Sequence, residues 1–218
     1  MSDLFRWDWV WDHLDEVASR TWEHIVLTFL AVFIGLLISF PIGIYAYRHR
    51  RVYGPVASVA GILYTIPSLA LFAFLVPFYG LSVTTAEIGL VSYTLLILIR
   101  NIVSGLDGVP DDAKEAAVGM GYSRRQLLWK VEMPLALPVV FAGVRLATVT
   151  TIGLVTVTAM IDQGGLGYFI RLGLQRFFST ASILGAVLSV ALAVGMDRLL
   201  VGSERLLTPW TRRRAART

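Results

Sequence analysis

Cysteine is absent from this chain of 218 residues, and charged residues are scarce. Without cysteine, neither a disulfide nor a thiolate metal site can form, and redox chemistry gives no argument about the compartment. Only 16% of the residues are charged, whereas 56% are hydrophobic and the mean hydropathy is +0.69. A balance so far from that of a soluble domain predicts an integral membrane protein.

A net charge of +4 and an isoelectric point near 9.6 raise the question of a nucleic-acid partner. The basic residues, however, gather beside apolar runs and at the C-terminus, where membrane topology accounts for them. We therefore read the charge as a determinant of orientation and expect no nucleic acid among the partners.

The N-terminal segment carries apolar residues at helical spacing but too many charges to span a bilayer. Six acidic side chains lie within residues 1–23, against only Arg6 and Arg20, which is the reverse of the basic start of a cleavable signal. The spacing predicts an amphipathic helix at the membrane interface, and we assign residues 1–21 to it, on the extracytoplasmic side. Its apolar face comprises Trp7, Val10, Trp11, Leu14, Val17 and Ala18.

Five long apolar runs follow, each long enough to cross a hydrocarbon core of about 30 Å at about 1.5 Å per residue. Pro67 is expected to bend or unwind the second run around residues 65–68. Arg100, near the end of the third run, is expected to reach the interface with its long side chain. The predicted spans are about 25–47, 56–79, 86–106, 137–161 and 181–200, with a non-spanning connection at 162–179 that opens with DQGGLG.

Basic residues are distributed unequally between the two sides that five spans define. If the N-terminus lies outside, the inner segments hold twelve lysines and arginines and the outer segments hold four. Since cytoplasmic loops carry the excess of basic residues, the N-terminus is predicted outside and the C-terminus in the cytoplasm. The inner set is Arg48, Arg50, Arg51, Lys114, Arg124, Arg125, Lys130, Arg205, Arg212, Arg213, Arg214 and Arg217, and the outer set is Arg6, Arg20, Arg171 and Arg176.

A polar stretch between the third and fourth runs, residues 107–134, cannot lie in lipid. We call it the elbow segment. Pro110 followed by two aspartates predicts a helix start, because proline and acidic side chains suit the first turn. Gly119 and Gly121 are expected to bend the chain, and a second short helix over 122–131 is expected to end at Pro134. On shape alone, an ordinary cytoplasmic loop accounts for this stretch equally well.

The order of residues within the elbow segment is more specific than its shape. Glu115-Ala116-Ala117, three residues, Gly121, nine residues, then Val131, Glu132, Met133 and Pro134 resemble the EAA motif of membrane subunits of bacterial ATP-binding-cassette (ABC) importers. That motif is written EAA, three residues, G, nine residues, I, x, L, P. Val131 and Met133 replace the isoleucine and leucine, and both changes are conservative.

Longer stretches resemble one branch of that family, the permeases for glycine betaine, carnitine and choline. They are IPSLALFAFLVPFYG at 66–80, LIRNIVSGLDGV at 98–109, the run at 115–149, and IDQGGLGYFIRLGLQRF at 161–177. The resemblance implies the type I importer permease fold, an all-α integral membrane protein with about five transmembrane helices, an interfacial N-terminal helix and a cytoplasmic coupling-helix elbow. It spans residues 22–202, the expected permease domain, which leaves 203–218 as a basic cytoplasmic tail.

The resemblance also implies partners. Members of the family work in the bacterial cytoplasmic membrane as pairs of permeases, identical or different, with two cytoplasmic ATPases and an extracytoplasmic substrate-binding protein. This chain has no phosphate-binding GxxxxGK[ST] sequence, so ATP is expected to bind the partner ATPase and not this chain. We therefore expect it to be no enzyme and to bind no cofactor or metal.

The same resemblance gives the elbow residues their expected roles. Glu115 is the polar anchor in a groove of the ATPase, Ala116 and Ala117 form a surface for close packing, and the chain turns at Gly121 before Tyr122. For the solute pathway, candidates come from the residues themselves: the kinked stretch, the hydroxyl-rich fourth run and the glycine loop, which could form an outer gate or receive the binding protein. They are Thr65, Pro67, Ser68, Thr151, Thr156, Gly164 and Gly165.

Alternative functions remain at this stage. Permeases for amino acids such as methionine have a similar length and the same elbow. A membrane enzyme would need convergent acidic or histidine side chains within the spans, and His13, His24 and His49 lie at or beyond span ends. A passive channel would not need an elbow that docks an ATPase. Tyr64 and Phe72 are candidates for an aromatic cage around a quaternary ammonium group, although packed or lipid-facing aromatic residues are the commoner case.

Overall fold

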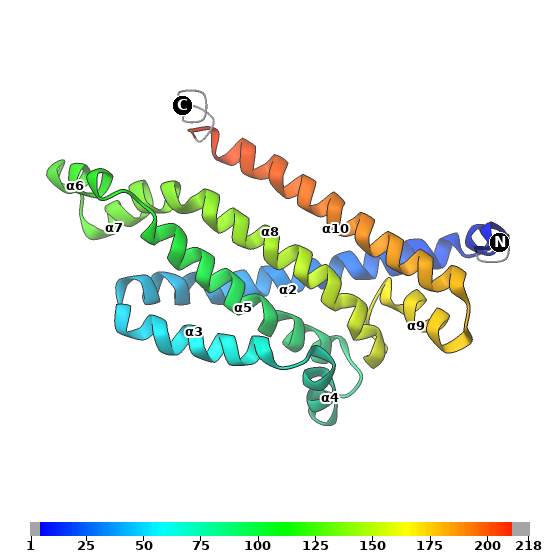
Figure 1. Cartoon of the computed structure of the whole chain (residues 1–218). Helices are drawn as coiled ribbons and strands as arrows, with labels where there is room; N and C mark the ends of the chain where they lie inside the picture. Colours follow the sequence, from blue (N-terminus) through cyan, green and yellow to red (C-terminus); the bar gives the residue numbers. More distant parts are fainter. Residues whose placement is uncertain (1–4, 211–218) are drawn as a thin grey trace.

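The computed structural model describes residues 5–210, and every regular element in that range is helical (Figure 1). The C-terminal arginines at 212–214 and 217 lie outside the described residues. The α-helices are α1 (Trp7–Asp12), α2 (Leu14–Arg48), α3 (Arg50–Thr65), α4 (Ser68–Tyr79), α5 (Val83–Asp107), α6 (Asp111–Gly119), α7 (Arg124–Leu127), α8 (Met133–Thr158), α9 (Gly167–Arg176) and α10 (Ser179–Leu207).

Long helices run between two ends of the molecule, as Figure 1 shows. One end carries α6 and α7, and we call it the α6 end. The other carries α9 and the N-terminus, and we call it the α9 end. Within residues 5–210, four helical stretches are long and apolar enough to cross a membrane, and the bent pair α3–α4 makes a fifth if it counts as one span. The expected all-helical membrane architecture with about five spans is confirmed.

The N-terminal region differs from the expected interfacial helix followed by a separate span. Helix α1 ends at Asp12, and α2 then continues without interruption for 35 residues, from Leu14 to Arg48. The acidic residues of this stretch do not break a helix, and no glycine or proline occurs before Gly35. A helix of this length measures about 50 Å, so it exceeds a hydrocarbon core of about 30 Å. His24, expected outside the spans, therefore lies inside α2 and is fully buried.

The second expected span is broken where the sequence indicated. Helices α3 and α4 meet at an angle of 92° across Ile66 and Pro67. Ile66 has an extended backbone, which is the conformation that a following proline favours. The carbonyl that the break frees is satisfied, because the Tyr93 hydroxyl of α5 donates a hydrogen bond to Ile66 O. The bend expected at residues 65–68 is thus confirmed and is held by α5.

Helix α5 forms the centre of the molecule and is buried along most of its length. Glycines on its neighbours allow close approach: a Cβ atom at Gly35 of α2 would lie 2.0 Å from Thr94 Oγ1, and one at Gly143 of α8 would lie 2.4 Å from the Asn101 Cβ. Small residues permit such contacts between membrane helices. Arg100 is an exposed residue of this largely buried helix.

The fourth span starts earlier than expected. The helix that begins at Arg124 does not end at Pro134; it continues as a π-helical turn, Leu128–Glu132, directly into α8. In this turn the Met133 amide donates to Leu128 O, five residues back. Pro134 then occupies the first turn of α8, where a missing N–H group costs little. The wider turn therefore accommodates the proline, and residues 124–161 form one continuous helical stretch.

Helices α9 and α10 differ from the sequence-based expectation in their bounds. The expected connection at 162–179 contains α9, and α10 continues past residue 202 to Leu207. Arg145 of α8 forms ion pairs with two acidic residues of α10, at 2.9 Å to Asp197 and 3.6 Å to Glu204. Because all three side chains are largely shielded, these pairs fix α10 against α8.

Candidate functional site

The elbow segment projects from the α6 end as two short helices (Figure 1). Helix α6 follows Pro110 and has Asp111 and Asp112 in its first turn, as expected. At its other end the Tyr122 amide donates to Ala117 O over 3.1 Å, and Gly121 has a φ of +84°. This left-handed conformation is the one that glycine adopts without strain, so Gly121 is the turn residue.

The second short helix has its own start signal. Ser123 Oγ accepts a hydrogen bond from the Gln126 amide, and the Gln126 side chain accepts one from the Ser123 amide. This reciprocal arrangement is a capping box. It fixes where α7 begins relative to the turn at Gly121, so the elbow has a defined shape.

The predicted coupling residues do not all face outward. Glu115, Ala116 and Gly121 are exposed, and Tyr122 is half-buried, but Ala117 is only 1% exposed. Ala116 therefore lies on the outer face of α6, whereas Ala117 points to its inner face. Ala117 packs against this chain itself and does not belong to the surface that a partner could contact.

Two apolar residues at the tip were missed by the sequence analysis. Val118 is 59% exposed and Met120 is 67% exposed, on either side of Gly119. Their apolar character within a polar stretch was the available signal. Together with Glu115 and Ala116 they give the elbow a small apolar surface beside one carboxylate, and such a surface suits burial in a partner protein.

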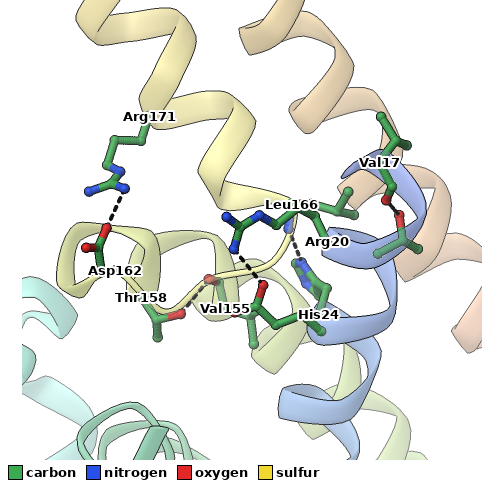
Figure 2. A network of polar contacts seen from close by, with 10 residues as sticks. Val17, Arg20, His24, Val155, Thr158, Asp162, Leu166 and Arg171 are labelled. Atoms are coloured by element: carbon green, nitrogen blue, oxygen red, sulfur yellow. Dashed lines mark hydrogen bonds and ion pairs between the residues drawn. The ribbon is translucent and has the colours of Figure 1, made fainter. Parts of the chain in front are cut away.

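The glycine loop at the α9 end, which runs from Asp162 to Leu166 in Figure 2, is tightly packed. A Cβ atom on Gly164 would lie 2.3 Å from the Ala159 amide nitrogen, and one on Gly167 would lie 2.2 Å from Thr156 O. Gly165 has a φ of +43°, and its Cβ would lie 2.7 Å from Arg20 O. The loop is therefore wedged between α2 and α8, and only glycine fits these positions.

His24 holds this loop in place. Its Nδ1 accepts a hydrogen bond from the Leu166 amide at 3.3 Å (Figure 2). Its Nε2 lies 3.0 Å from Ile152 O, to which it donates. With one ring nitrogen accepting and the other donating, the imidazole is neutral. The histidine joins α2, α8 and the glycine loop. The sequence analysis missed this role, because its partners are 128 and 142 positions away.

Charged and aromatic side chains surround the loop. Arg171 of α9 pairs with Asp162 at 2.6 Å, and the Arg20 guanidinium lies 4.2 Å from the centroid of the Tyr168 ring. Burial raises the pKa of the Tyr168 hydroxyl, and the nearby Glu16 carboxylate adds to this effect. The phenol therefore remains neutral at ordinary pH, and α9 is attached to α2 by a cation–π contact.

The remaining pathway candidates occupy two places. Thr65 and Pro67 are exposed and Ser68 is half-buried at the α3–α4 bend, and Ile66 packs in one cluster with Leu154 of α8. On α8, Thr151 is buried, whereas Thr156 is half-buried and its carbonyl meets the glycine loop. The structure thus places Thr156 against Gly167, at the end of the glycine loop that contains Gly164 and Gly165, and places the bend against α8.

The aromatic-cage candidates have different surroundings. Phe72 is fully buried in the core, where its ring packs against Gly89, so it cannot face a solute. Tyr64 is 38% exposed and contacts the Tyr93 ring edge-on at 5.8 Å. Among the described residues 5–210, no group of three or more histidine, aspartate and glutamate side chains is arranged to hold a metal ion.

Replacing His24 by leucine is expected to destabilise the protein by about 2–3 kcal/mol, because the buried Leu166 amide then lacks an acceptor. The measurement is the apparent Tm of the purified protein in detergent. His49→Leu is the matched control, since His49 is exposed and bonds only to a local carbonyl. Equal Tm values for the two variants would contradict the role assigned to His24.

Comparison with known proteins places this geometry in a family. Residues 25–208 match the family described as binding-protein-dependent transport system inner membrane component. The choline transport system permease protein OpuBB of Bacillus subtilis is 36% identical over 194 residues, which cover 89% of each chain. The osmoprotectant import permease protein OsmW of Salmonella typhimurium is 37% identical over 203 residues, covering 91% of this chain and 94% of that protein.

Solved structures agree on the fold. An inward-facing structure of the MetNI methionine ABC transporter superimposes with a TM-score of 0.79 at 23% identity, over 90% of this chain and 98% of that one. A second crystal form gives a TM-score of 0.82 with the same coverage. The match over residues 25–208, the identities above 30% and the shared fold agree: the chain belongs to the family of inner-membrane components of binding-protein-dependent transport systems.

Proposed function

We propose that the chain is one permease subunit of an ATP-driven importer that moves a compatible solute such as glycine betaine, carnitine or choline. The solute is delivered by a separate binding protein. The support comes from the relatives, since OpuBB is named for choline transport and OsmW for osmoprotectant import, and both align over nearly their whole length.

The proposed orientation places the N-terminus outside and the α6 end in the cytoplasm. The excess of lysine and arginine on the segments at the α6 end supports it. In this orientation the elbow segment faces the cytoplasmic ATPase, the glycine loop faces the binding protein, and a second permease subunit, identical or different, completes the pore. ATP binds the partner ATPase, and this chain carries no cofactor of its own.

The single observation that carries the mechanism is the continuity between the elbow and a spanning helix. From the capping box at Ser123, one helical stretch runs to Ile161 and so extends from the α6 end to the α9 end. A short element clamped in a moving partner transmits rigid-body motion to the helix that continues it. Glu115, Ala116 and the turn at Gly121 form the contact with the ATPase, together with Tyr122 beside the turn.

The proposed solute pathway follows the interrupted elements. The bend at Thr65, Pro67 and Ser68 and the hydroxyl groups of Thr151 and Thr156 supply polar groups within the spans, and backbone that is not helical occurs in membranes only where protein or water covers it. Gly164 and Gly165 belong to the outer gate, where a change in the packing between α2 and α8 would open the way to the binding protein.

Uptake into vesicles tests this function. The chain is co-expressed with a candidate ATPase and a candidate binding protein from neighbouring genes, and labelled glycine betaine, carnitine, choline and methionine are supplied with and without ATP. We expect ATP-dependent uptake of at least one quaternary ammonium solute and none of methionine. Uptake of methionine alone would assign the chain to an amino-acid importer, and uptake that needs no ATP would indicate a passive channel.

A further inference from the structure

Both ends of the elbow segment are attached to one corner of the molecule. The corner is residues 47–50, where α2 ends and α3 begins. Asp107 precedes the elbow helices and Glu132 follows them, and each is bonded to a side chain of this corner. The partners are 85 and 57 positions apart in sequence, so only the fold brings them together.

The first attachment joins Tyr47 to Glu132. The Tyr47 hydroxyl donates a hydrogen bond of 2.8 Å to Glu132 Oε1. Glu132 is only 7% exposed and belongs to the π-helical turn that links α7 to α8. A hydrogen bond to a charged group that is shielded from water is among the stronger kinds, and its loss leaves a buried acceptor unpaired.

The second attachment joins Arg50 to Asp107. Two hydrogen bonds of 2.7 and 2.5 Å connect the guanidinium to the carboxylate in a bidentate pair. The same guanidinium lies 5.3 Å from the centroid of the Tyr47 ring. The two attachments are thus in contact with each other. The Arg50 pair is largely exposed and contributes less than the Tyr47 bond.

The corner leads directly to the bend. Helix α3 starts at Arg50 and reaches the 92° break after Thr65. A movement of the elbow segment that pulls on Glu132 and Asp107 therefore also pulls on α3. Without these bonds, the corner would follow the elbow only through the Arg48–Arg124 contact and the packing of α2 and α3 against α5.

We propose that the Tyr47–Glu132 hydrogen bond, supported by the Arg50–Asp107 pair, transmits the movement of the elbow segment to the α2–α3 corner. Tyr47 and Glu132 are positioning residues that couple ATP hydrolysis to transport, an inference that rests on the proposed function. They act through the helices that they join and contact no solute. Glu132 stands at the variable position of the EAA-type motif, so the motif itself does not assign it.

The test compares four variants of the complete transport complex in vesicles. Tyr47→Phe removes the donor, Glu132→Met removes the acceptor, the double variant removes both, and Glu132→Gln keeps an acceptor oxygen. We expect solute transported per ATP hydrolysed to fall about tenfold in each of the first two, to fall no further in the double variant, and to stay near the wild-type value in Glu132→Gln.

Tyr45→Phe is the matched control. Tyr45 lies two positions before Tyr47, is exposed, and stacks on His49. A purely structural role for the bond would lower transport and ATPase activity together and leave their ratio unchanged. An unchanged ratio in assembled Tyr47→Phe and Glu132→Met complexes overturns the proposal. If instead the wild-type complex shows no ATP-dependent uptake, the proposed function itself fails.

Discussion

Gly121→Val is expected to abolish ATP-dependent uptake while the chain still inserts in the membrane. The φ of +84° at Gly121 lies in the left-handed region, where a side chain costs about 1–2 kcal/mol and a β-branched residue costs more. Nothing lies within 4 Å of a Cβ atom at this position, so the substitution creates no internal clash. It changes the turn between α6 and α7 and places a branched side chain on the surface that we propose to meet the ATPase. The measurements are uptake in vesicles and copurification of the ATPase, and both should fall to background.

Gly80→Val is the control that distinguishes the cost of a side chain at a positive φ from an effect on the elbow segment. Gly80 also has a positive φ, +69°, and a Cβ atom there would also meet open space, but it lies between α4 and α5, away from the elbow segment. Its substitution should cost comparable stability and leave copurification of the ATPase intact. Normal ATP-driven uptake by the Gly121→Val complex would overturn the assignment of the elbow as the coupling site.

The elbow could be predicted from the sequence because its signals are local. Acidic residues after Pro110 start α6, Gly121 turns the chain, and the spacing from Glu115 to Pro134 identifies the family. The bend at Pro67 is local in the same sense, because proline constrains itself and the residue before it. Five apolar runs with unequal basic flanks were likewise sufficient for the number of spans.

The errors arose where tertiary packing overrides a local signal. Pro134 is a sound stop signal for an ordinary α-helix, but a π-helical turn just before it lets the helix continue. Charges before His24 suggested an interfacial helix apart from the first span, yet nothing in that stretch interrupts a helix, and α2 starts at Leu14. Ala117 matched the motif as well as Ala116 did, so both were predicted to form the packing surface. In the structure the Ala116 side chain is exposed and the Ala117 side chain is buried.

The contacts that hold the site together could not be predicted, because each joins distant parts of the chain. Tyr47 with Glu132, Arg145 with Asp197, and His24 with Leu166 are separated by 85, 52 and 142 positions. A single sequence indicates that these side chains are polar residues near apolar runs, but pairing depends on which helices become neighbours. The partner of each group therefore became known only with the fold.

The glycine loop at the α9 end gives the largest expected effect on stability. Gly165→Ala places a methyl group at a φ of +43°, with its carbon 2.6 Å from the His24 Cβ and 2.7 Å from Arg20 O. Neither the backbone conformation nor the contacts with Arg20 O and His24 Cβ can relax by a change of rotamer, so α2 must move away from the loop. We expect a loss of about 3 kcal/mol, and the apparent Tm in detergent should fall by roughly 6–12 °C.

Gly195→Ala is the matched change on α10, where a Cβ atom meets nothing within 4 Å. Alanine inside a helix is favoured over glycine by about 1 kcal/mol, so this variant should be at least as stable as the wild type. Gly165→Ala should thus lower the Tm, whereas Gly195→Ala should leave it unchanged or raise it. Equal Tm values for the two variants would show that the loop is not wedged between α2 and α8. Because the expected movement separates α2 from α8 at the loop that His24 holds, Gly165→Ala should also weaken the bond between His24 and Leu166. Combined with His24→Leu, it should therefore cost less than the sum of the two single changes.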